Sequence, residues 1–373
     1  DAPTPTLDEV YRSAMKPALG SCGVLLAFLA LSKSQTLPLC DVGVTTMTVS
    51  TTAQAVDLSE ALLCSGGQFE VTWLGQVLIT STIVVSDGTS LRITGSSFGS
   101  QGVVDGGGFI RLFEVYPGST LELDSLSLVG GYSASFGGGV ELVDLFLVSS
   151  SGTASLDIVD CSFVGNTANN GGAISSTGGT VTIAGNTTFA SNSAASFGGA
   201  IRSIEGTLTI AGNSSFVNNY AAASGGAIDF DGTFRAEGRT SFARNSAGNF
   251  GGAIAGFNAD DLTLRGESFF SDNFASFGGG AIYMDYFAFG ETFIDPTIVT
   301  IEDTSTFMNN TSDGLGGAIG LDRSDATIRG TTTFIDNSAM TGGAVFYASG
   351  DLTIEGETYF GYNSAEAYGG ETF

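Results

Sequence analysis

The chain contains no histidine, little positive charge and only four cysteines. The absence of histidine removes the commonest general base and the commonest metal ligand of proteins. Both lysines, Lys16 and Lys33, lie near the N-terminus; lysine and arginine together number 12 against 38 acidic residues, and the formal net charge is −26. Because phosphate recognition needs clustered basic side chains, the sequence predicts neither a nucleic-acid partner nor an anionic membrane partner.

The cysteines show no CxxC spacing, which argues against a zinc site. Cys40 and Cys64 flank an amphipathic stretch and could be joined by a disulfide. Cys161 falls on an alternating segment and is predicted to be a small, buried apolar residue.

The N-terminal region has the pattern of a secretory signal. Residues 23–31 form an uninterrupted apolar run that is preceded by Lys16 and followed by small residues. The run is too short to span a bilayer as a helix, which takes about 20 residues. Residues 1–14 are acidic and proline-rich. We therefore interpret 1–34 as a signal peptide with an upstream extension and Met15 as the true start; a buried core strand is the alternative.

What the sequence has in excess is glycine, 55 residues, and much of it follows an internal repeat. A Gly-Gly-Ala-Ile motif recurs at intervals of about 27 residues, the mark of a stacked-coil architecture. One interval is longer, because 37 residues separate Gly279 from Gly316. The first glycine of the motif stands at 171, 198, 225, 251, 279 and 316, and variants follow at 342 and 369.

A second motif, Phe-x-x-Asn, keeps step with the first. Each Asn precedes the next glycine pair by five or six residues. We predict that these Asn side chains form a hydrogen-bonded ladder along one turn, as stacked amides do in cross-β arrays, and that the Phe side chains form an inward column. The ladder residues are Asn166, Asn192, Asn219, Asn245, Asn273, Asn310, Asn337 and Asn363.

Between these motifs, apolar residues alternate with threonine, as in Val181-Thr-Ile183. Alternation of this kind is typical of half-buried strands, and it predicts three short strands in each repeat. Such a unit cannot bury a core alone, but coils stacked about 4.8 Å apart can. The glycine pairs are expected at corners that need positive φ and close backbone approach.

The phased double motif resembles the repeats of the chlamydial polymorphic outer-membrane proteins. In addition, residues 57–62 resemble the capping helix of secreted right-handed parallel β-helix proteins. The resemblance implies an all-β fold: a single-stranded right-handed parallel β-helix (β-solenoid) of about ten coils, with a short N-terminal capping helix. The cap is expected within 35–65 and the β-helix over 66–373, with the repeat clearest from 138.

The resemblance also implies a secreted or cell-surface protein that is not an enzyme and acts in adhesion or as an extracellular coat component. Its partner would be a surface protein or glycan of another cell or of the wall. An open sheet edge is expected after the last glycine pair, and two explanations are open: the sequence is a fragment, or an end-to-end or cap-covering protein partner covers that edge.

The alternative is a polysaccharide-active lyase or hydrolase on the same scaffold. Glycoside hydrolysis needs two carboxylates that face one cleft, and the adjacent acids Asp260/Asp261 and Asp229/Asp231 are the candidates. No cofactor is expected; Ca²⁺ at the Asp-rich turns is a weaker alternative to plain solvation of those turns.

The long interval carries about ten extra residues with several aromatic side chains, and insertions in solenoids often project on the binding face. We take Tyr283, Tyr286, Phe287 and Phe289 as a candidate binding loop. The alternative is a lengthened strand that buries these aromatics.

Four N-x-[S/T] sequons mark acceptor sites for N-glycosylation, provided that the source is eukaryotic. They begin at Asn186, Asn213, Asn309 and Asn310. Asn310 also belongs to the predicted ladder, where a buried side chain would stay unmodified.

Overall fold

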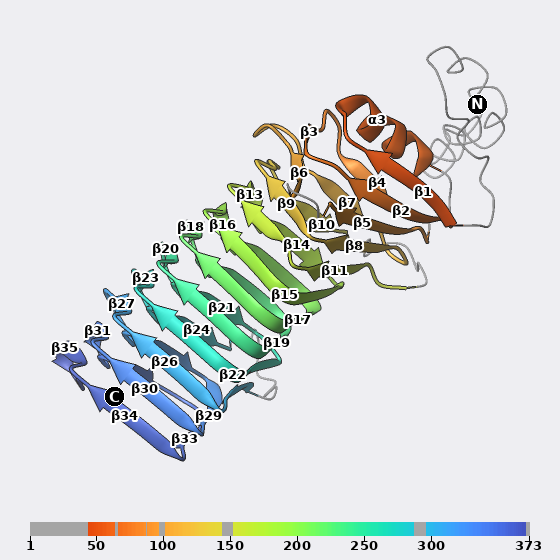
Figure 1. Ribbon diagram of the computed structural model, residues 1–373. Coiled ribbons are helices and arrows are strands. Elements are labelled where there is room, and N and C mark those ends of the chain that lie inside the picture. The colour runs from red at the N-terminus through yellow and green to blue at the C-terminus, as the bar shows by residue number, and fades with distance from the viewer. Residues whose placement is uncertain are drawn as a thin grey trace, which may run out of the picture. The chain divides into compact units, whose positions relative to one another are not determined.

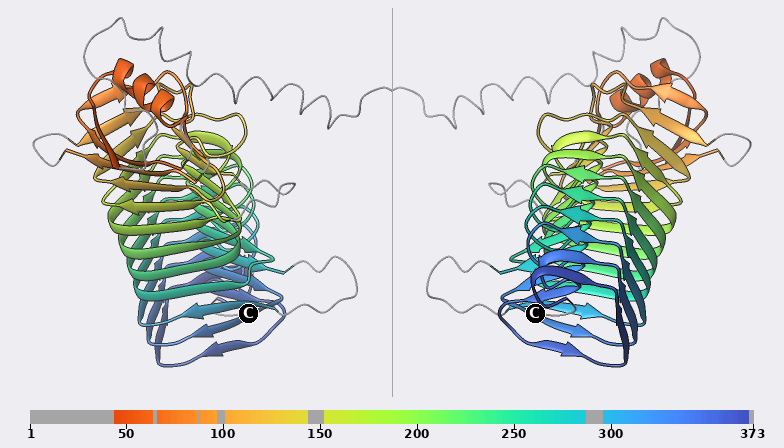
Figure 2. Two further views of the ribbon diagram at one scale, coloured as in Figure 1. Left: turned by 90° about the vertical axis from the view of Figure 1, so that its right-hand side faces the viewer. Right: turned by 90° about the vertical axis from the view of Figure 1, so that its left-hand side faces the viewer.

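The computed structural model describes residues 44–63, 66–86, 88–96, 101–143, 152–286 and 296–370. These residues form a parallel β-solenoid of about eleven turns, which confirms the predicted fold class. Figure 2 shows the coils stacked one upon the next. The proposed signal segment, together with Cys40 and Cys64, lies outside the described residues.

One helix, α3 (Thr52–Ala61), lies at the N-terminal end of the described solenoid (Figure 1). The Thr51 side chain caps it by accepting a hydrogen bond from the N–H of Gln54, and Ala55 and Leu58 are buried. The predicted capping helix is therefore present, although it begins five residues before Asp57. Among the described residues, no helix has the length and apolarity of a membrane span.

The first strand of each coil follows the glycine pair or its equivalent, and its apolar side chains point inward. Neighbouring first strands pair in parallel. Those that stand alone are β4 (Ile83–Val85), β7 (Phe113–Val115), β10 (Val140–Leu142), β14 (Ile174–Thr177), β21 (Ile254–Phe257), β24 (Ile282–Asp285), β28 (Ile319–Asp322) and β32 (Val345–Tyr347).

The second strand of each coil is the alternating Leu-Thr-Ile segment, and the third carries the repeat Phe. The separate second strands are β1 (Val44–Val49), β2 (Gln68–Trp73), β5 (Ser90–Gly95), β8 (Thr120–Asp124), β11 (Ser155–Val159), β25 (Thr297–Ile301), β29 (Ser324–Ile328) and β33 (Leu352–Ile354). The separate third strands are β3 (Gln76–Leu78), β6 (Gly102–Asp105), β9 (Leu126–Val129), β12 (Ser162–Val164), β26 (Thr304–Met308), β30 (Thr331–Ile335) and β34 (Glu357–Gly361).

In the central coils these strands run together, which differs from the prediction of three short strands. Strands β15 (Thr180–Ala190) and β22 (Asp261–Ser271) join the second and third strands, while β17 (Ile201–Val217) and β19 (Ile228–Ala243) join all three. The chain turns each corner without losing its pairing, because residues such as Gly185 (φ +65°) bend the backbone while the ladder to the next coil continues.

A second sheet of eight short strands was not foreseen from the sequence. Its inward positions are mostly alanine, and its outward positions vary. The strands are β13 (Thr167–Asn170), β16 (Ser193–Phe197), β18 (Tyr220–Ala221), β20 (Ser246–Ala247), β23 (Phe274–Ala275), β27 (Thr311–Ser312), β31 (Ser338–Thr341) and β35 (Ser364–Tyr368).

The core is built of columns, as the repeat predicts. The repeat Phe rings, from Phe163 to Phe360, stack with centroids 4.7–4.9 Å apart and planes within 2–9° of parallel. Cys161 is buried and unpaired, as expected, and burial raises the pKa of its thiol to about 12. Each coil thus buries its apolar side chains against the same side chains of its neighbours.

The glycine pairs show both expected features, positive φ and close approach of the backbone to the next coil. Gly225 lies at φ +65°, whereas Gly226 lies so close to the next coil that a Cβ there would stand 2.1 Å from the Gly252 carbonyl oxygen. The first glycine therefore supplies the turn and the second supplies the close approach.

Candidate functional site

The predicted Asn ladder is present along one corner of the solenoid. Asn192 donates from its backbone N–H and from Nδ2 to Oδ1 of Asn219, both at 3.0 Å, and its Nδ2 also donates to the Phe163 carbonyl at 3.0 Å. Its own Oδ1 accepts the equivalent two bonds from Asn166. All the hydrogen-bonding capacity of this buried amide is used, so the ladder is structural and leaves nothing for a ligand.

The residue before each ladder Asn always has a left-handed backbone conformation, with positive φ. The sequence motif alone does not predict this conformation. Ser191, Asn218, Arg244 and Asn309 at this position have φ between 53° and 55°. Positive φ favours Gly, Asn and Asp, and this explains why the second variable residue of Phe-x-x-Asn is often one of these.

Tyr283 does not belong to an exposed binding loop. It lies on β24 with 5% of its surface exposed, and its ring stacks on Phe250 at a centroid distance of 4.4 Å. Gly278 and Gly320 leave the space for this ring, because a Cβ at either position would come within 2.9 Å of it. The alternative expectation, a buried strand aromatic, holds for Tyr283.

The rest of the candidate loop is only partly described. Tyr286 follows β24 and is half-buried, while Phe287 and Phe289 lie outside the described residues. The loop interpretation therefore stays a prediction for these three residues.

Three of the four sequon asparagines are exposed: Asn186, Asn213 and Asn309. Asn186 and Asn213 stand in register on adjacent coils, and Nδ2 of Asn213 donates to Oδ1 of Asn186 at 3.1 Å. Asn310 is fully buried, and both of its Nδ2 hydrogens are donated within the ladder. It is therefore not an acceptor site in the folded protein.

The two candidate carboxylate pairs are each split by the fold. Asp229 is 1% exposed and forms an ion pair with Arg202, whereas Asp231 faces a groove. Asp261 pairs with Arg235 at 2.8 Å, whereas Asp260 lines the same groove as Asp231. The two acids of each candidate pair therefore do not face one common groove. Coil stacking instead places residues about 27 positions apart in the sequence side by side.

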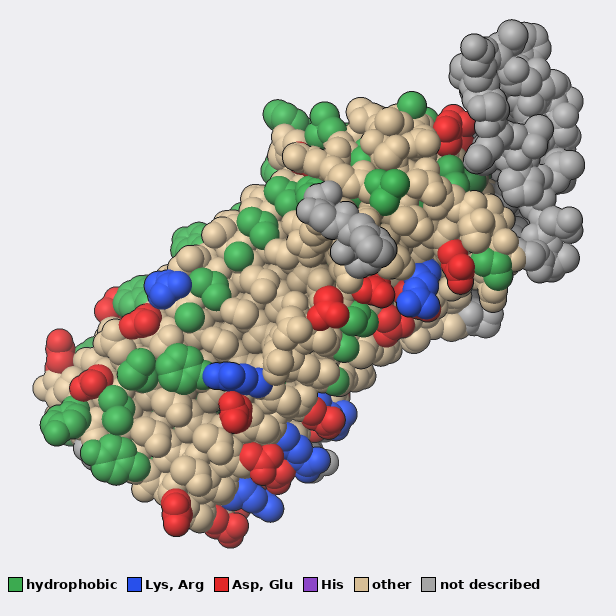
Figure 3. All heavy atoms as spheres, viewed as in Figure 1, with side chains coloured by type: hydrophobic (Ala, Val, Ile, Leu, Met, Phe, Trp, Pro, Cys, Tyr) green, Lys and Arg blue, Asp and Glu red, His purple; other side chains and the backbone are tan. Residues whose placement is uncertain are grey.

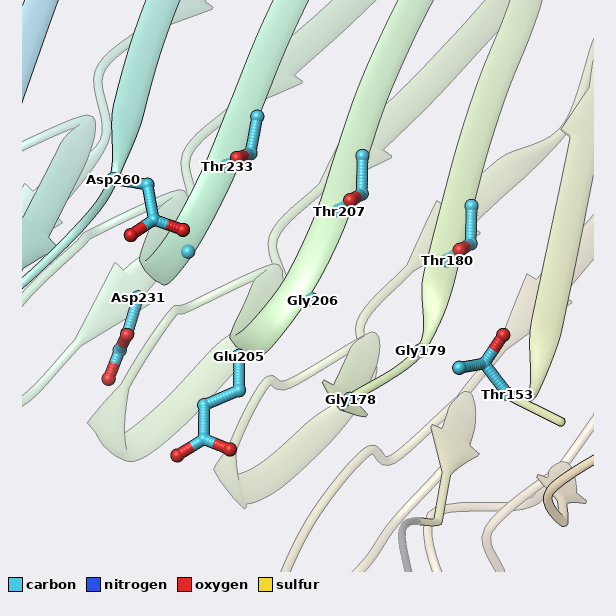
Figure 4. Close-up of a pocket in the computed structure, with 11 residues that line it drawn as sticks. Thr153, Gly178, Gly179, Thr180, Glu205, Gly206, Thr207, Asp231, Thr233 and Asp260 are labelled. Atoms are coloured by element: carbon cyan, nitrogen blue, oxygen red, sulfur yellow. The ribbon is translucent and has the colours of Figure 1, made fainter. Parts of the chain in front are cut away.

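The groove lies where the first strand of a coil turns into the second, and it has a volume of about 440 Å³ (Figure 4). Three coils each contribute one carboxylate, Glu205, Asp231 and Asp260. Sequence reasoning missed Glu205, because it stands at a register shift: Asp231 pairs with Ile204 and Gly232 pairs with Gly206, so Glu205 is the extra residue between them. A row of threonine side chains, Thr153, Thr180, Thr207 and Thr233, lines the other side.

Two acidic residues in and beside the groove, Asp231 and Asp229, have pKa values raised above the usual range. Burial raises the pKa of Asp231; Glu205 and Asp260 raise it further, while Arg202 lowers it. Burial also raises the pKa of Asp229 to about 7, against the opposing attraction of Arg202, and Oδ2 of Asp229 has no hydrogen-bond partner. Within the described residues, no three acidic or cysteine side chains are grouped so as to hold a metal ion.

The arginines do not form a basic surface. Eight of the nine in the described ranges pair with a carboxylate within 4 Å. The ninth, Arg244, donates to the side chain of Asn218. In one column the charges alternate from coil to coil, and Glu302 lies between Arg265 (2.7 Å) and Arg329 (3.8 Å). Positive charge is thus neutralised locally, and the net excess is acidic.

Comparison with known families finds the Chlamydia polymorphic membrane protein repeat. It matches four times, at residues 160–177, 186–203, 267–285 and 304–321. Each match spans one Phe-x-x-Asn motif and the Gly-Gly-Ala-Ile that follows it, so the matched unit is the corner, the short strand of the second sheet and the glycine turn. No curated protein and no solved structure matches the chain. The repeat associates the chain with surface or outer-membrane proteins.

Proposed function

We propose that this chain, which carries the polymorphic membrane protein repeat, is a non-enzymatic solenoid exported to the cell surface or the extracellular space, where it binds a partner and acts in adhesion. The observation that carries the proposal is the fourfold repeat match, because that repeat is one of surface or outer-membrane proteins. A role in an extracellular coat is the variant of this proposal in which the partner is another coat component.

The distribution of side chains supports a scaffold that presents its outer surface. Inward positions are occupied by repeated columns of Phe, Ile and Asn, so variation between coils falls on outward positions. The acidic excess and the locally paired arginines favour a neutral or cationic partner, such as a surface protein or an uncharged glycan. Polyanions such as nucleic acids are disfavoured by the same charges.

The test is binding of the purified, fluorescently labelled chain to a panel of intact cells and isolated wall material, together with protease treatment of intact source cells to establish surface exposure. Saturable binding and cleavage without lysis are expected. Protection from protease on intact cells, together with no saturable binding, would contradict the proposal.

The candidate loop can be tested in the same assay. A variant with Tyr286, Phe287 and Phe289 replaced by Ser keeps the buried Tyr283 and should lose binding if this segment contacts the partner. Phe109→Ser is the matched control, because Phe109 is 85% exposed and lies far from this segment in the sequence. Unchanged binding of the triple variant would remove the loop from the proposal.

The groove favours one second candidate, a glycoside-cleaving enzyme. It brings the acidic side chains of consecutive coils together, and the raised pKa of Asp231 suits a general acid, with Glu205 or Asp260 as the second acidic group. Reducing-sugar release over a panel of glycans tests it, with Asp231→Asn as the disabling change and Asp261→Asn, outside the groove, as the control. Activity that survives Asp231→Asn would refute this assignment.

A further inference from the structure

The residue immediately before each glycine pair forms a continuous column along one edge of the solenoid. Backbone pairing connects these positions from coil to coil, from Phe136 through Phe197 and Phe250 to Tyr368. Large apolar residues occupy every second coil and small or polar residues occupy the coils between. The large ones are Phe136, Phe197, Phe250, Leu315 and Tyr368, and the intervening ones are Asn170, Ser224, Gly278 and Thr341.

We call the five large residues the alternate-coil stripe. Parallel strands lie about 4.8 Å apart, so its side chains recur about every 9.6 Å. Phe136 and Tyr368 are 36% and 65% exposed, and the other three are half-buried. Apolar side chains recur along the edge of the molecule that carries β13 to β35 (Figure 3).

The two half-buried rings of the stripe, Phe197 and Phe250, each pack against another side chain. The guanidinium of Arg202 lies 4.5 Å from the centroid of Phe197. Phe250 stacks on Tyr283 and also contacts Phe277, which is 58% exposed and extends the apolar surface into the next coil. These contacts fix the positions of the Phe197 and Phe250 rings, which lowers the entropy cost of binding.

We propose that the alternate-coil stripe binds an extended, neutral, β-linked polysaccharide whose every second sugar ring packs on one member of the stripe. This inference rests on the proposed function and names the chemistry of its partner. In an extended two-fold chain of β-linked sugars, every second ring presents the same face in the same direction, and two rings span a length comparable to two coils. The apolar C–H face of a sugar suits an aromatic ring.

Charge and area favour this occupant over others. A polyanionic glycan would meet an acidic surface whose described arginines are already partnered. A protein partner needs about 800 Å² on each side, whereas the stripe is narrow and is interrupted at every other coil by Asn170, Ser224, Gly278 or Thr341. Asn170, Ser224 and Thr341 place polar side chains beside the intervening sugars, whose hydroxyls need hydrogen bonds.

The test measures depletion of the full chain by microcrystalline cellulose and by chitin, with polygalacturonate as the anionic comparison. The double variant Phe197→Ser/Phe250→Ser should bind about tenfold or more weakly, because two stacking contacts are lost. Serine is tolerated at this position, since Ser224 occupies it in the coil between them. Phe109→Ser, which alters an exposed aromatic outside the stripe, should bind as the unaltered chain does.

A second variant avoids the half-buried rings. Phe136→Ser/Tyr368→Ser changes the two most exposed members of the stripe and should weaken binding with no shift in the melting temperature. Three results would overturn the inference. They are no depletion by either neutral polysaccharide, binding to polygalacturonate alone, and equal binding by the stripe variants and the control. Binding to cells that persists in Phe197→Ser/Phe250→Ser also overturns it while leaving the proposed function intact; absence of cell binding by the unaltered chain contradicts the proposed function itself.

Discussion

Oδ1 of Asn219 accepts two hydrogen bonds from Asn192 of the preceding coil, one from the backbone N–H and one from Nδ2, each at 3.0 Å. Asn219 passes the same pair of bonds on to Oδ1 of Asn245. Each rung therefore ties a side chain and a backbone to the next coil, in a part of the molecule that water does not reach.

Removing one rung should be far more costly than removing an exposed amide. Asn219→Ala removes the acceptor of the Asn192 backbone N–H and of one Nδ2 hydrogen of Asn192, together with the side-chain donor to the Phe189 carbonyl, and we expect a loss of about 3 to 5 kcal/mol in unfolding free energy. Asn213→Ala, an exposed change in the same coil, should cost about 0.5 kcal/mol or less. Guanidinium denaturation followed by circular dichroism compares them, and similar midpoints for the two variants would contradict a structural role for the ladder.

The two glycine roles predict different penalties for alanine. Gly226→Ala places a Cβ 2.1 Å from the Gly252 carbonyl oxygen, so the coils must separate, and we expect about 3 kcal/mol or more of destabilisation. At Gly165 (φ +64°) no atom lies within 4 Å of the added Cβ, so alanine should cost only the left-handed strain, about 1 to 2 kcal/mol. Gly165→Asn should be milder still, because Asn218 and Asn309 occupy this position in other coils. A smaller loss of stability for Gly226→Ala than for Gly165→Ala, measured by thermal unfolding, would argue against tight coil contact.

The buried Asp229 predicts a loss of stability as the pH rises. Burial raises its pKa from 3.8 to about 7, so between these values the folded chain holds a proton that the unfolded chain has released. Its contribution to stability is fully present below about pH 4 and is lost as the pH rises through about 7, with a slope of at most about 1.4 kcal/mol per pH unit.

Asp229→Asn should remove that share of the pH dependence, although it also removes the partner of Arg202 and lowers stability at every pH. The informative quantity is therefore the difference between the two proteins in urea midpoint as a function of pH. It should change between about pH 4 and 7 and be constant above. A difference that stays constant across that window would show that Asp229 does not titrate there.

The sequons predict a selective modification pattern in a eukaryotic secretory host. Asn186→Gln and Asn213→Gln should each remove one glycan, because both side chains are exposed. Asn310→Gln should remove none and should instead lower the yield of folded protein, since Asn310 is a ladder rung. Mass spectrometry of glycopeptides decides; a glycan on Asn310 in folded protein would contradict the ladder at that coil.

Much of the scaffold was predictable because a repeat removes the usual ambiguity of sequence interpretation. A single Phe or Asn predicts nothing about the fold. Their in-phase recurrence from Phe163 and Asn166 onward predicts that equivalent side chains stack in columns along the solenoid. The second sheet escaped prediction because strands as short as Tyr220–Ala221 carry too few residues to show alternation.

The candidate sites were much less predictable. Tyr283 stands in an aromatic stretch that resembles a binding loop, and it is buried only because Gly278 and Gly320 leave room for its ring in the adjoining coils. The carboxylates that line the groove come from three coils and are far apart in the chain: Glu205, Asp231 and Asp260. In each of the two sequence-neighbouring pairs, Asp229/Asp231 and Asp260/Asp261, only one member lines the groove.

The in-phase recurrence of Phe, Asn and the glycine pairs was by itself sufficient to predict a stacked, all-β solenoid and the membership of its internal columns, because every coil must satisfy the same contacts as the last. The arrangement of side chains on the surface could be determined only from the three-dimensional structure. Which side chains lie together there depends on the register between coils and on the size of the residue one coil above or below. That register aligns Phe136, Phe197 and Phe250 at alternate coils and leaves Asp229 buried against Arg202.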